Sequence, residues 1–400
     1  MDRMEPRADR RRTGSEKRGI LQPVLARWRA LPPPRRKAIA WALGLTVLMA
    51  YPFLDKALNL QTLYATTDAA VFVVLALGLN IVVGYAGLLD LGYAAFFAIG
   101  AYTTGVLTWP AHGLEWNFWI VLWVSVAIAA LFGILIGAPT LRVRGDYLAI
   151  ITLAFGEIIP IAFRNLWHID IRIGRFVLIE NFNLTNGPQG LNPVGRPWIF
   201  GFEFGFDPLP WYFLILGIGG LVIAASRRLE DSRLGRAWMA IREDETAADC
   251  MGIDPIKTKL LAFALGASFS GFAGAFYAAK LQAIFPELFR FQVSIMILCM
   301  VILGGMGNIK GVVIGGLFIL FFDRVVLAQS TQMVKALGKT LNIAALATLD
   351  LQLWRWFFFG ATLIVVMILR PEGLFPSAQR KAELHAADEA LGGLEEEAPP

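Results

Sequence analysis

Long apolar runs dominate this sequence, and short polar segments separate them. A helix needs about 20 apolar residues to cross roughly 30 Å of hydrocarbon, and most of the runs approach that length. One run, 292–305, is short enough to be a re-entrant or half helix. The predicted membrane helices are 38–54, 62–84, 92–109, 118–138, 147–164, 211–226, 259–280, 292–305, 309–328 and 354–370.

The runs do not alternate between apolar and polar residues, which argues against the strands of a membrane barrel. Only helices and closed barrels satisfy backbone hydrogen bonds in lipid. The composition agrees, because 56% of the residues are hydrophobic and only 17% are charged, whereas soluble domains contain roughly 25% charged residues. We therefore expect an all-α membrane protein with about ten transmembrane helices.

Basic residues determine the predicted orientation. With both termini in the cytoplasm, most of the 36 Lys and Arg residues lie on or beside inner segments, as the positive-inside rule requires. The prediction is a multi-pass protein of a bacterial-type plasma (inner) membrane. It divides into a basic cytoplasmic tail (1–37), a transmembrane domain (38–375) and an acidic tail (376–400) whose composition is typical of disorder.

Two segments between the runs carry structural signals. The outer segment 165–210 contains turn residues, including Asn186-Gly187-Pro188, and predicts an ordered cap with a short helix or hairpin. The inner segment 227–258 is charged and predicts a helix, because Leu234, Trp238 and Ile241 recur at helical spacing and give a mainly apolar face. Asp231 or Ser232 is placed to cap its start. Such a helix could instead lie on the membrane surface.

Small residues recur every four positions in the run 259–280. Gly266, Ser270 and Gly274 form one row, and Gly271 lies in the neighbouring row. Rows of small residues let membrane helices approach closely, so we predict tight packing here, which is also compatible with a sliding surface. The same spacing recurs near 309–328. The candidate packing residues are Gly266, Ser270, Gly271, Gly274, Gly307, Gly311 and Gly315.

Charged residues inside apolar runs are candidates for function, because burying them costs several kcal/mol unless they are paired or hydrated. Glu157 is the clearest, near the middle of 147–164, and Asp68 lies in 62–84. Glu157 has two interpretations: a structural hydrogen bond to a neighbouring helix, or a cavity-lining group that meets a substrate ammonium. Asn80 and Glu157 are the substrate-path candidates. Asp90, near the inner face, fits loop geometry better.

No residue pattern suggests catalysis, a metal site or a cofactor. The three histidines are scattered along the chain, and Cys250 and Cys299 lack a partner-like spacing. We find no pairing of a nucleophile with a base. The chain is therefore not expected to be an enzyme.

Several segments, taken together, resemble LivM-type permeases for branched-chain amino acids. They are GLNIVVGYAGLLDLGY (78–93), LRVRGDYLAI (141–150), LAFGEI (153–158), TNGPQG (185–190), GRAW (235–238), IREDE (241–245), VILGGMGN (301–308) and RPEGL (370–374). The resemblance covers about 70–375 in order. Glu245, Ala247, Ala248 and Gly252 also resemble the EAA loop of ABC-transporter permeases. The match is looser in the N-terminal tail, at 165–182 and at 329–353.

The resemblance implies the permease subunit of an ATP-driven importer, of the BtuC-like/ribose-permease-like type, with inverted internal repeats. Its implied partners are a LivH-like sister permease, two ABC ATPase subunits and an extracytoplasmic solute-binding protein. ATP hydrolysis is expected in the partner subunits. The implied ATPase-docking residues are Leu234, Gly235, Arg236, Trp238, Ile241, Arg242, Glu243, Glu245, Ala247, Ala248 and Gly252.

Other functions remain open at this point. The same scaffold carries permeases for other amino acids or urea. An ion-driven secondary carrier would need relay groups or broken-helix ion sites, and this chain has few buried charges. A membrane-embedded enzyme would need paired catalytic groups, which we do not find.

Overall fold

The computed structural model describes residues 33–58, 62–141, 143, 145–173, 176–199, 201–341, 348–370 and 373–375. The chain divides into two units, Met1–Gln61 and Thr62–Pro400. In the first unit, the described part is helix α2 (Pro33–Ala57) and the residue after it. Residues 1–32 of the predicted basic tail and the whole predicted acidic tail lie outside the described residues.

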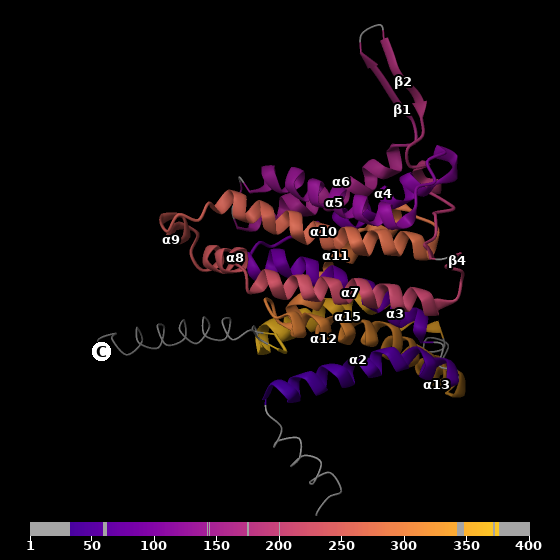
Figure 1. Cartoon of the computed structure of the whole chain (residues 1–400). Helices are drawn as coiled ribbons and strands as arrows, with labels where there is room; N and C mark the ends of the chain where they lie inside the picture. Colours follow the sequence, from indigo (N-terminus) through magenta and orange to yellow (C-terminus); the bar gives the residue numbers. More distant parts are fainter. Residues whose placement is uncertain are drawn as a thin grey trace, which may run out of the picture. The chain divides into compact units, whose positions relative to one another are not determined.

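The second unit is a bundle of helices (Figure 1). These helices are α3 (Leu63–Leu79), α4 (Ala94–Thr108), α5 (Phe118–Thr140), α6 (Asp146–Asn165), α7 (Pro208–Glu230), α8 (Arg233–Glu243), α9 (Glu245–Cys250), α10 (Pro255–Leu281), α11 (Phe291–Gly304), α12 (Ile309–Phe321), α13 (Leu327–Thr340) and α15 (Arg355–Leu369).

The predicted helical membrane fold is confirmed, and each predicted apolar run coincides with a helix. Among the described residues, eight helices are long and apolar enough to cross a membrane. The run 92–109 forms only the 15-residue α4, which is shorter than a span. The run 309–328 lies in a continuous helical stretch that extends through α13 to Thr340.

Polar residues start the long helices at defined points. Asp254 accepts a hydrogen bond from the Lys257 backbone N–H at 3.1 Å, and Pro255 occupies the first turn of α10. Asp207 and Pro208 start α7 in the same way. A side-chain cap satisfies a backbone donor that the helix leaves free, and proline there loses no hydrogen bond. These caps fix where each apolar run becomes helical.

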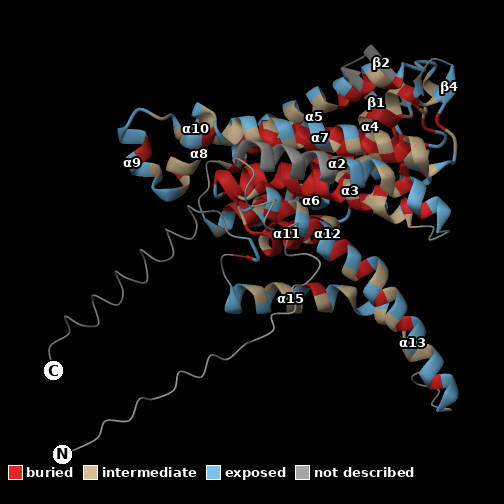
Figure 2. Ribbon diagram, turned by 60° about the horizontal axis from the view of Figure 1, so that its bottom comes forward, coloured by how far each residue is buried: buried red, intermediate tan, exposed pale blue. Residues whose placement is uncertain are grey.

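Helix α10 lies at the centre of the second unit, packed against α3, α4 and α5. Figure 2 shows that α10 and α3 are largely buried, whereas α13 and α15 expose much of their surface. The close approach depends on glycine: a Cβ added at Gly100 of α4 would lie 2.8 Å from the Gly271 Cα of α10. Small residues replace the bulky side chains that would hold these backbones apart.

The chain between α3 and α4 is irregular. Helix α3 continues as a π-helix, η1 (Asn80–Tyr85), and residues 86–93 then run without a regular helix into α4. Tyr93 at its end is fully buried, and its hydroxyl donates to the Gly266 carbonyl oxygen of α10 at 2.7 Å. Irregular backbone in a membrane protein is tolerated where protein surrounds it, and Tyr93 meets that condition.

The segment 165–210 contains two hairpins. Strands β1 (Ile169–Ile173) and β2 (Phe176–Phe182) pair antiparallel, as do β3 (Trp198–Ile199) and β4 (Phe202–Glu203). A short 3₁₀ turn (Gly187–Gln189) lies between the two hairpins. The backbone of Leu191 pairs with that of Ile284, which ties this segment to the chain after α10.

Candidate functional site

Helix α8 is amphipathic, and the protein itself covers its apolar face. The Ser232 hydroxyl accepts a hydrogen bond from the Gly235 N–H at 3.2 Å and so caps the helix start. Trp238 is fully buried, and its indole N–H donates to the Thr258 carbonyl oxygen at 2.7 Å. Ile241 is also buried. The apolar face is therefore not free to lie on a membrane surface, which argues against that interpretation.

The charged segment is two helices rather than the continuous helix that its periodicity predicts. Asp244 ends α8 in an extended conformation, and its carboxylate accepts from the Thr246 and Ala247 N–H groups at 2.8 and 3.0 Å. Aspartate caps a helix better than it continues one, so a second helix, α9, starts at Glu245. Pro255 follows α9 and begins α10.

The docking candidates divide by exposure. Gly235, Trp238, Ile241 and Ala248 are buried, so a partner protein cannot reach them here. Leu234, Arg242 and Glu245 are half-buried. The remaining candidates are exposed, namely Arg236, Glu243, Ala247 and Gly252.

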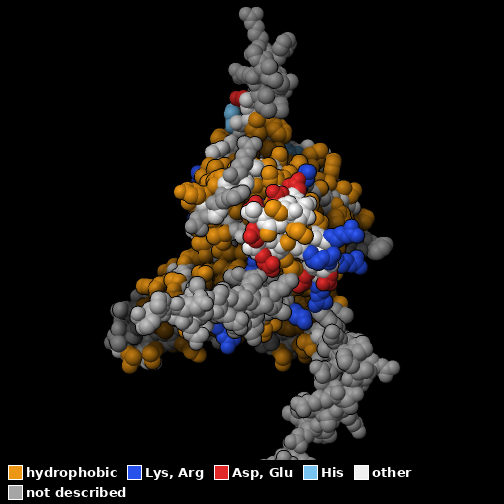
Figure 3. Space-filling model, turned by 90° about the vertical axis from the view of Figure 1, so that its left-hand side faces the viewer, with side chains coloured by type: hydrophobic (Ala, Val, Ile, Leu, Met, Phe, Trp, Pro, Cys, Tyr) orange, Lys and Arg blue, Asp and Glu red, His pale blue; other side chains and the backbone are white. Residues whose placement is uncertain are grey.

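Two large apolar side chains are exposed at this end of the bundle. Met251 is 83% exposed and Ile256 is 61% exposed, both beside α9. Figure 3 looks onto this end and shows acidic and basic side chains around a few hydrophobic ones. Gly252 has φ +84°, a backbone conformation that favours glycine and lets the chain turn from α9 toward α10. The hydrogen bonds of Lys257, first from its backbone N–H and then from its ammonium, hold the pKa of Asp254 below its ordinary value.

Two polar contacts tie this end to the membrane helices. The Arg242 guanidinium donates to the Gly84 carbonyl oxygen of η1 at 2.6 Å. The Glu245 carboxylate pairs with the Lys259 ammonium of α10 at 2.8 Å. A movement of α8 and α9 would therefore be transmitted to η1 and α10.

Asn80 lies in the interior rather than on an open pathway. It is 1% exposed, and its amide oxygen accepts from the Gly307 backbone N–H at 2.9 Å. This contact joins η1 to the turn between α11 and α12. The Asn80 amide oxygen is thus used to hold this turn, and a role of Asn80 on the substrate path stays a prediction.

The predicted small-residue positions contact different helices. Added Cβ atoms would meet α3 at Gly266, α5 at Gly271 and α4 at Gly274, and Ser270 is buried beside them. At α12, Gly311 and Gly315 lie against Gly304 of α11. Gly307 belongs to the preceding turn, with φ +82°, so it is not part of a helix surface as its spacing suggested.

Glu157 lies on an exposed stripe of α6, where residues alternate three and four positions apart. The stripe consists of Tyr147, Ile150, Ala154, Glu157, Ile161 and Arg164. Glu157 and Arg164 line a pocket of about 330 Å³, and its other wall includes Glu287, Arg290 and Gln292. Among the described residues, no hydrogen bond ties Glu157 to a neighbouring helix. The structural interpretation of Glu157 therefore lacks the bond that it requires.

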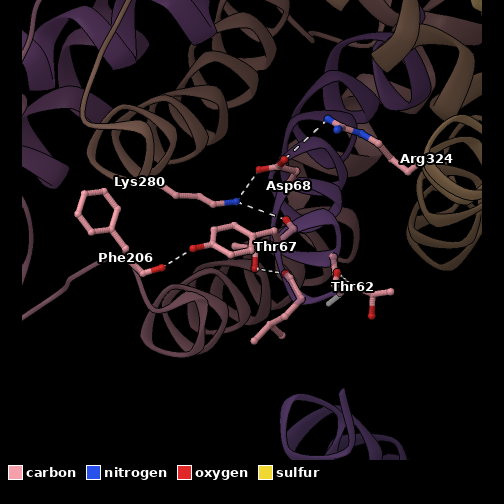
Figure 4. A network of polar contacts seen from close by, with 9 residues as sticks. Thr62, Thr67, Asp68, Phe206, Lys280 and Arg324 are labelled. Carbon is pink, nitrogen blue, oxygen red and sulfur yellow. Dashed lines mark hydrogen bonds and ion pairs between the residues drawn. The ribbon is translucent and has the colours of Figure 1, made fainter. Parts of the chain in front are cut away.

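Asp68 is the centre of a charge network that sequence reasoning did not assemble (Figure 4). Its carboxylate pairs with the Lys280 ammonium of α10 at 2.5 Å and lies 3.7 Å from the Arg324 guanidinium. Asp323 in turn lies 3.7–3.8 Å from Arg324 and Arg355. The sequence shows that these charged residues lie inside or beside apolar runs. It does not show which of them form ion pairs. Within the described ranges, no group of three or more His, Cys, Asp or Glu residues could hold a metal ion.

Comparisons with known proteins agree on one family. The sequence profile described as "Branched-chain amino acid transport system / permease component" matches residues 61–367. The chain is 33% identical to the Escherichia coli (strain K12) high-affinity branched-chain amino acid transport system permease protein LivM, over 85% of this chain and 75% of that protein. It is 25% identical to a probable LivM of Methanocaldococcus jannaschii, over 76% and 90%. It is also 25% identical to LivH of Salmonella typhimurium, over 67% and 83%. No solved structure matches.

Proposed function

Since this chain belongs to the branched-chain amino acid transport permease family, we propose that it is the membrane path of an ATP-driven importer for branched-chain amino acids. A LivH-like sister permease would share the pathway, and two ATPase subunits would supply the energy. A solute-binding protein would deliver the amino acid from outside. The chain itself would hydrolyse no ATP.

The observation that supports this proposal best is the end of the bundle formed by α8 and α9. Its apolar face is occupied by the protein, whereas Arg236, Glu243 and the neighbouring Met251 and Ile256 are exposed. Protein interfaces combine an apolar centre with a polar rim. A cytoplasmic ATPase subunit would bind to such a surface.

The contacts of this end suggest how ATP binding would reach the pathway. Closure of the ATPase subunits would move α8 and α9, and Arg242 and Glu245 would pass that movement to η1 and α10. Asn80 would extend it to the turn between α11 and α12. Packed elements with two arrangements can carry coupling of this kind.

Reconstitution tests the proposal. The chain, its sister permease, the ATPase subunits and the binding protein are placed in liposomes, and uptake of labelled leucine, isoleucine and valine is measured. Uptake should require ATP and the binding protein, and it should persist when ionophores collapse ion gradients. Leucine uptake driven by an ion gradient without ATP would overturn the proposal in favour of a secondary carrier.

Competition separates the substrate alternatives in the same preparation. Unlabelled branched-chain amino acids should compete with labelled leucine, whereas urea in large excess should not. Preferential uptake of urea, or of an unrelated amino acid, would keep the permease class but overturn the substrate assignment.

A further inference from the structure

The pocket beside Glu157 is lined by four charged side chains, which is unusual for a gap left by imperfect packing. Glu157 and Arg164 come from α6, and Glu287 and Arg290 come from the turn before α11 and its cap. Two acidic and two basic side chains thus face one space, together with Gln292. None of the four charged residues forms an ion pair within 4.0 Å in the described part of the chain.

The charge of these groups disfavours lipid as their neighbour. Glu157 lies near the middle of α6, on a stripe that the chain leaves exposed. A charged side chain facing hydrocarbon costs several kcal/mol, so such residues face water or another protein. In a permease that works with a sister subunit, an exposed stripe that carries Glu157 and Arg164 fits the pathway between the two.

The charge composition indicates which solute fits. A carboxylate only accepts hydrogen bonds and suits an ammonium, while a guanidinium donates two parallel bonds and suits a carboxylate. The pocket offers both kinds of group from both walls and has no net formal charge. A zwitterion needs both partners, whereas urea needs neither. The volume of about 330 Å³ is within the roughly 300–1,000 Å³ of small-molecule sites.

We infer that this pocket is a transient site for the charged end of a zwitterionic amino acid on its way through the membrane. The inference rests on the proposed function and narrows it, because it selects amino acids over urea. Glu157 or Glu287 receives the ammonium, and Arg164 or Arg290 receives the carboxylate.

The test uses the reconstituted complex and three single variants, Glu157→Gln, Arg164→Gln and Arg290→Gln. Leucine uptake per assembled complex should fall about tenfold in each, which is the effect of losing one hydrogen bond to a charged group. ATP hydrolysis stimulated by the loaded binding protein should stay near wild type, because the docking end is unchanged. Three variants keep the test valid if one of them fails to assemble.

Glu203→Gln is the matched control, since Glu203 is an exposed carboxylate on β4 that does not line the pocket. It should transport leucine at the wild-type rate. The inference would be overturned if the pocket variants imported leucine at the wild-type rate, or if Glu203→Gln lost as much uptake as they do. In either case the proposed function would still stand, provided that the unmodified complex imports leucine. A wild-type complex that hydrolyses ATP but imports no leucine would overturn both.

Discussion

Glu245 shows how one residue of the docking segment can have an internal as well as an external role. It is the first residue of α9, half-buried, and its carboxylate lies 2.8 Å from the Lys259 ammonium. Lys259 is itself mostly covered, with a side chain 12% exposed. A covered ion pair depends on both partners, because the survivor of a single substitution keeps its charge without compensation.

A charge exchange tests this internal role. Glu245→Lys should place two ammonium groups together and reduce ATP-driven uptake severalfold, while the chain still reaches the membrane. The double variant Glu245→Lys/Lys259→Glu should recover most of the uptake, because the attraction returns with its direction reversed. Uptake and ATPase activity of the reconstituted complexes are the measurements.

Glu203→Lys provides the comparison and should leave uptake at the wild-type level, since exposed Glu203 on β4 is not a docking candidate. If the double variant were as impaired as Glu245→Lys, the ion pair would not be the reason for the loss. The carboxylate would then act directly on the ATPase subunit.

At the scale of elements, α10 organises the bundle because its small residues admit α3, α4 and α5. A Cβ added at Gly271 would lie 2.9 Å from both the Ser125 carbonyl oxygen and the Val126 Cα of α5. Both atoms belong to backbone, which cannot rotate away as a side chain can. Gly217 of α7 is a contrast, because nothing lies within 4 Å of its added Cβ.

Gly271→Leu should therefore lower the yield of assembled complex and its thermal stability. Overpacking a tight interior typically costs roughly 1–3 kcal/mol, and a leucine against backbone belongs at the upper end. Gly217→Leu should assemble at nearly the wild-type level. Co-purification with the sister permease and the ATPase subunits, followed by thermal unfolding, measures both effects; equal behaviour of the two variants would contradict the packing argument.

The sequence predicts these elements better than it predicts their contacts. An apolar run favours a membrane helix through the sum of its own residues, so 118–138 and 147–164 were identifiable without knowing their neighbours. The break at Asp244 was missed because one capping side chain outweighs the apolar periodicity around it.

Contacts between residues that are far apart in the sequence could not be predicted, for a different reason. Asp68 and Lys280 are 212 positions apart, and Glu157 lines one pocket with Arg290, which comes from a separate element. Only the folded bundle determines such neighbours. Glu157 could be recognised as unusual from its place in an apolar run. The sequence did not indicate that Arg164 and Arg290 line the same pocket.

At the scale of the whole molecule, one cysteine can be used to test the proposed orientation in the membrane. Cys250 is exposed on α9, whereas Cys299 is buried in α11. A thiol reagent that cannot cross membranes should therefore react at one end of the bundle. If α8 and α9 face the cytoplasm, only that side gives access to Cys250.

Inside-out vesicles should label with an impermeant maleimide, and intact cells should not. Added ATPase subunits should slow the labelling severalfold by covering α9. Cys250→Ser should abolish the signal and identifies the reacting thiol. Labelling from the cell exterior would reverse the proposed orientation, and labelling unaffected by ATPase subunits would move the docking surface elsewhere.

The short helix α4 has a consequence for how the ribosome delivers this protein. Its 15 residues rise about 22 Å, too little to cross roughly 30 Å of hydrocarbon. Its anchor is Tyr93, whose partner Gly266 comes 173 residues later. At ~5–20 residues per second, synthesis needs roughly 9–35 seconds to supply that partner. The first half of the chain must therefore wait in the membrane, shielded by lipid or by the insertion machinery, and acquires its final packing only after α10 has been made.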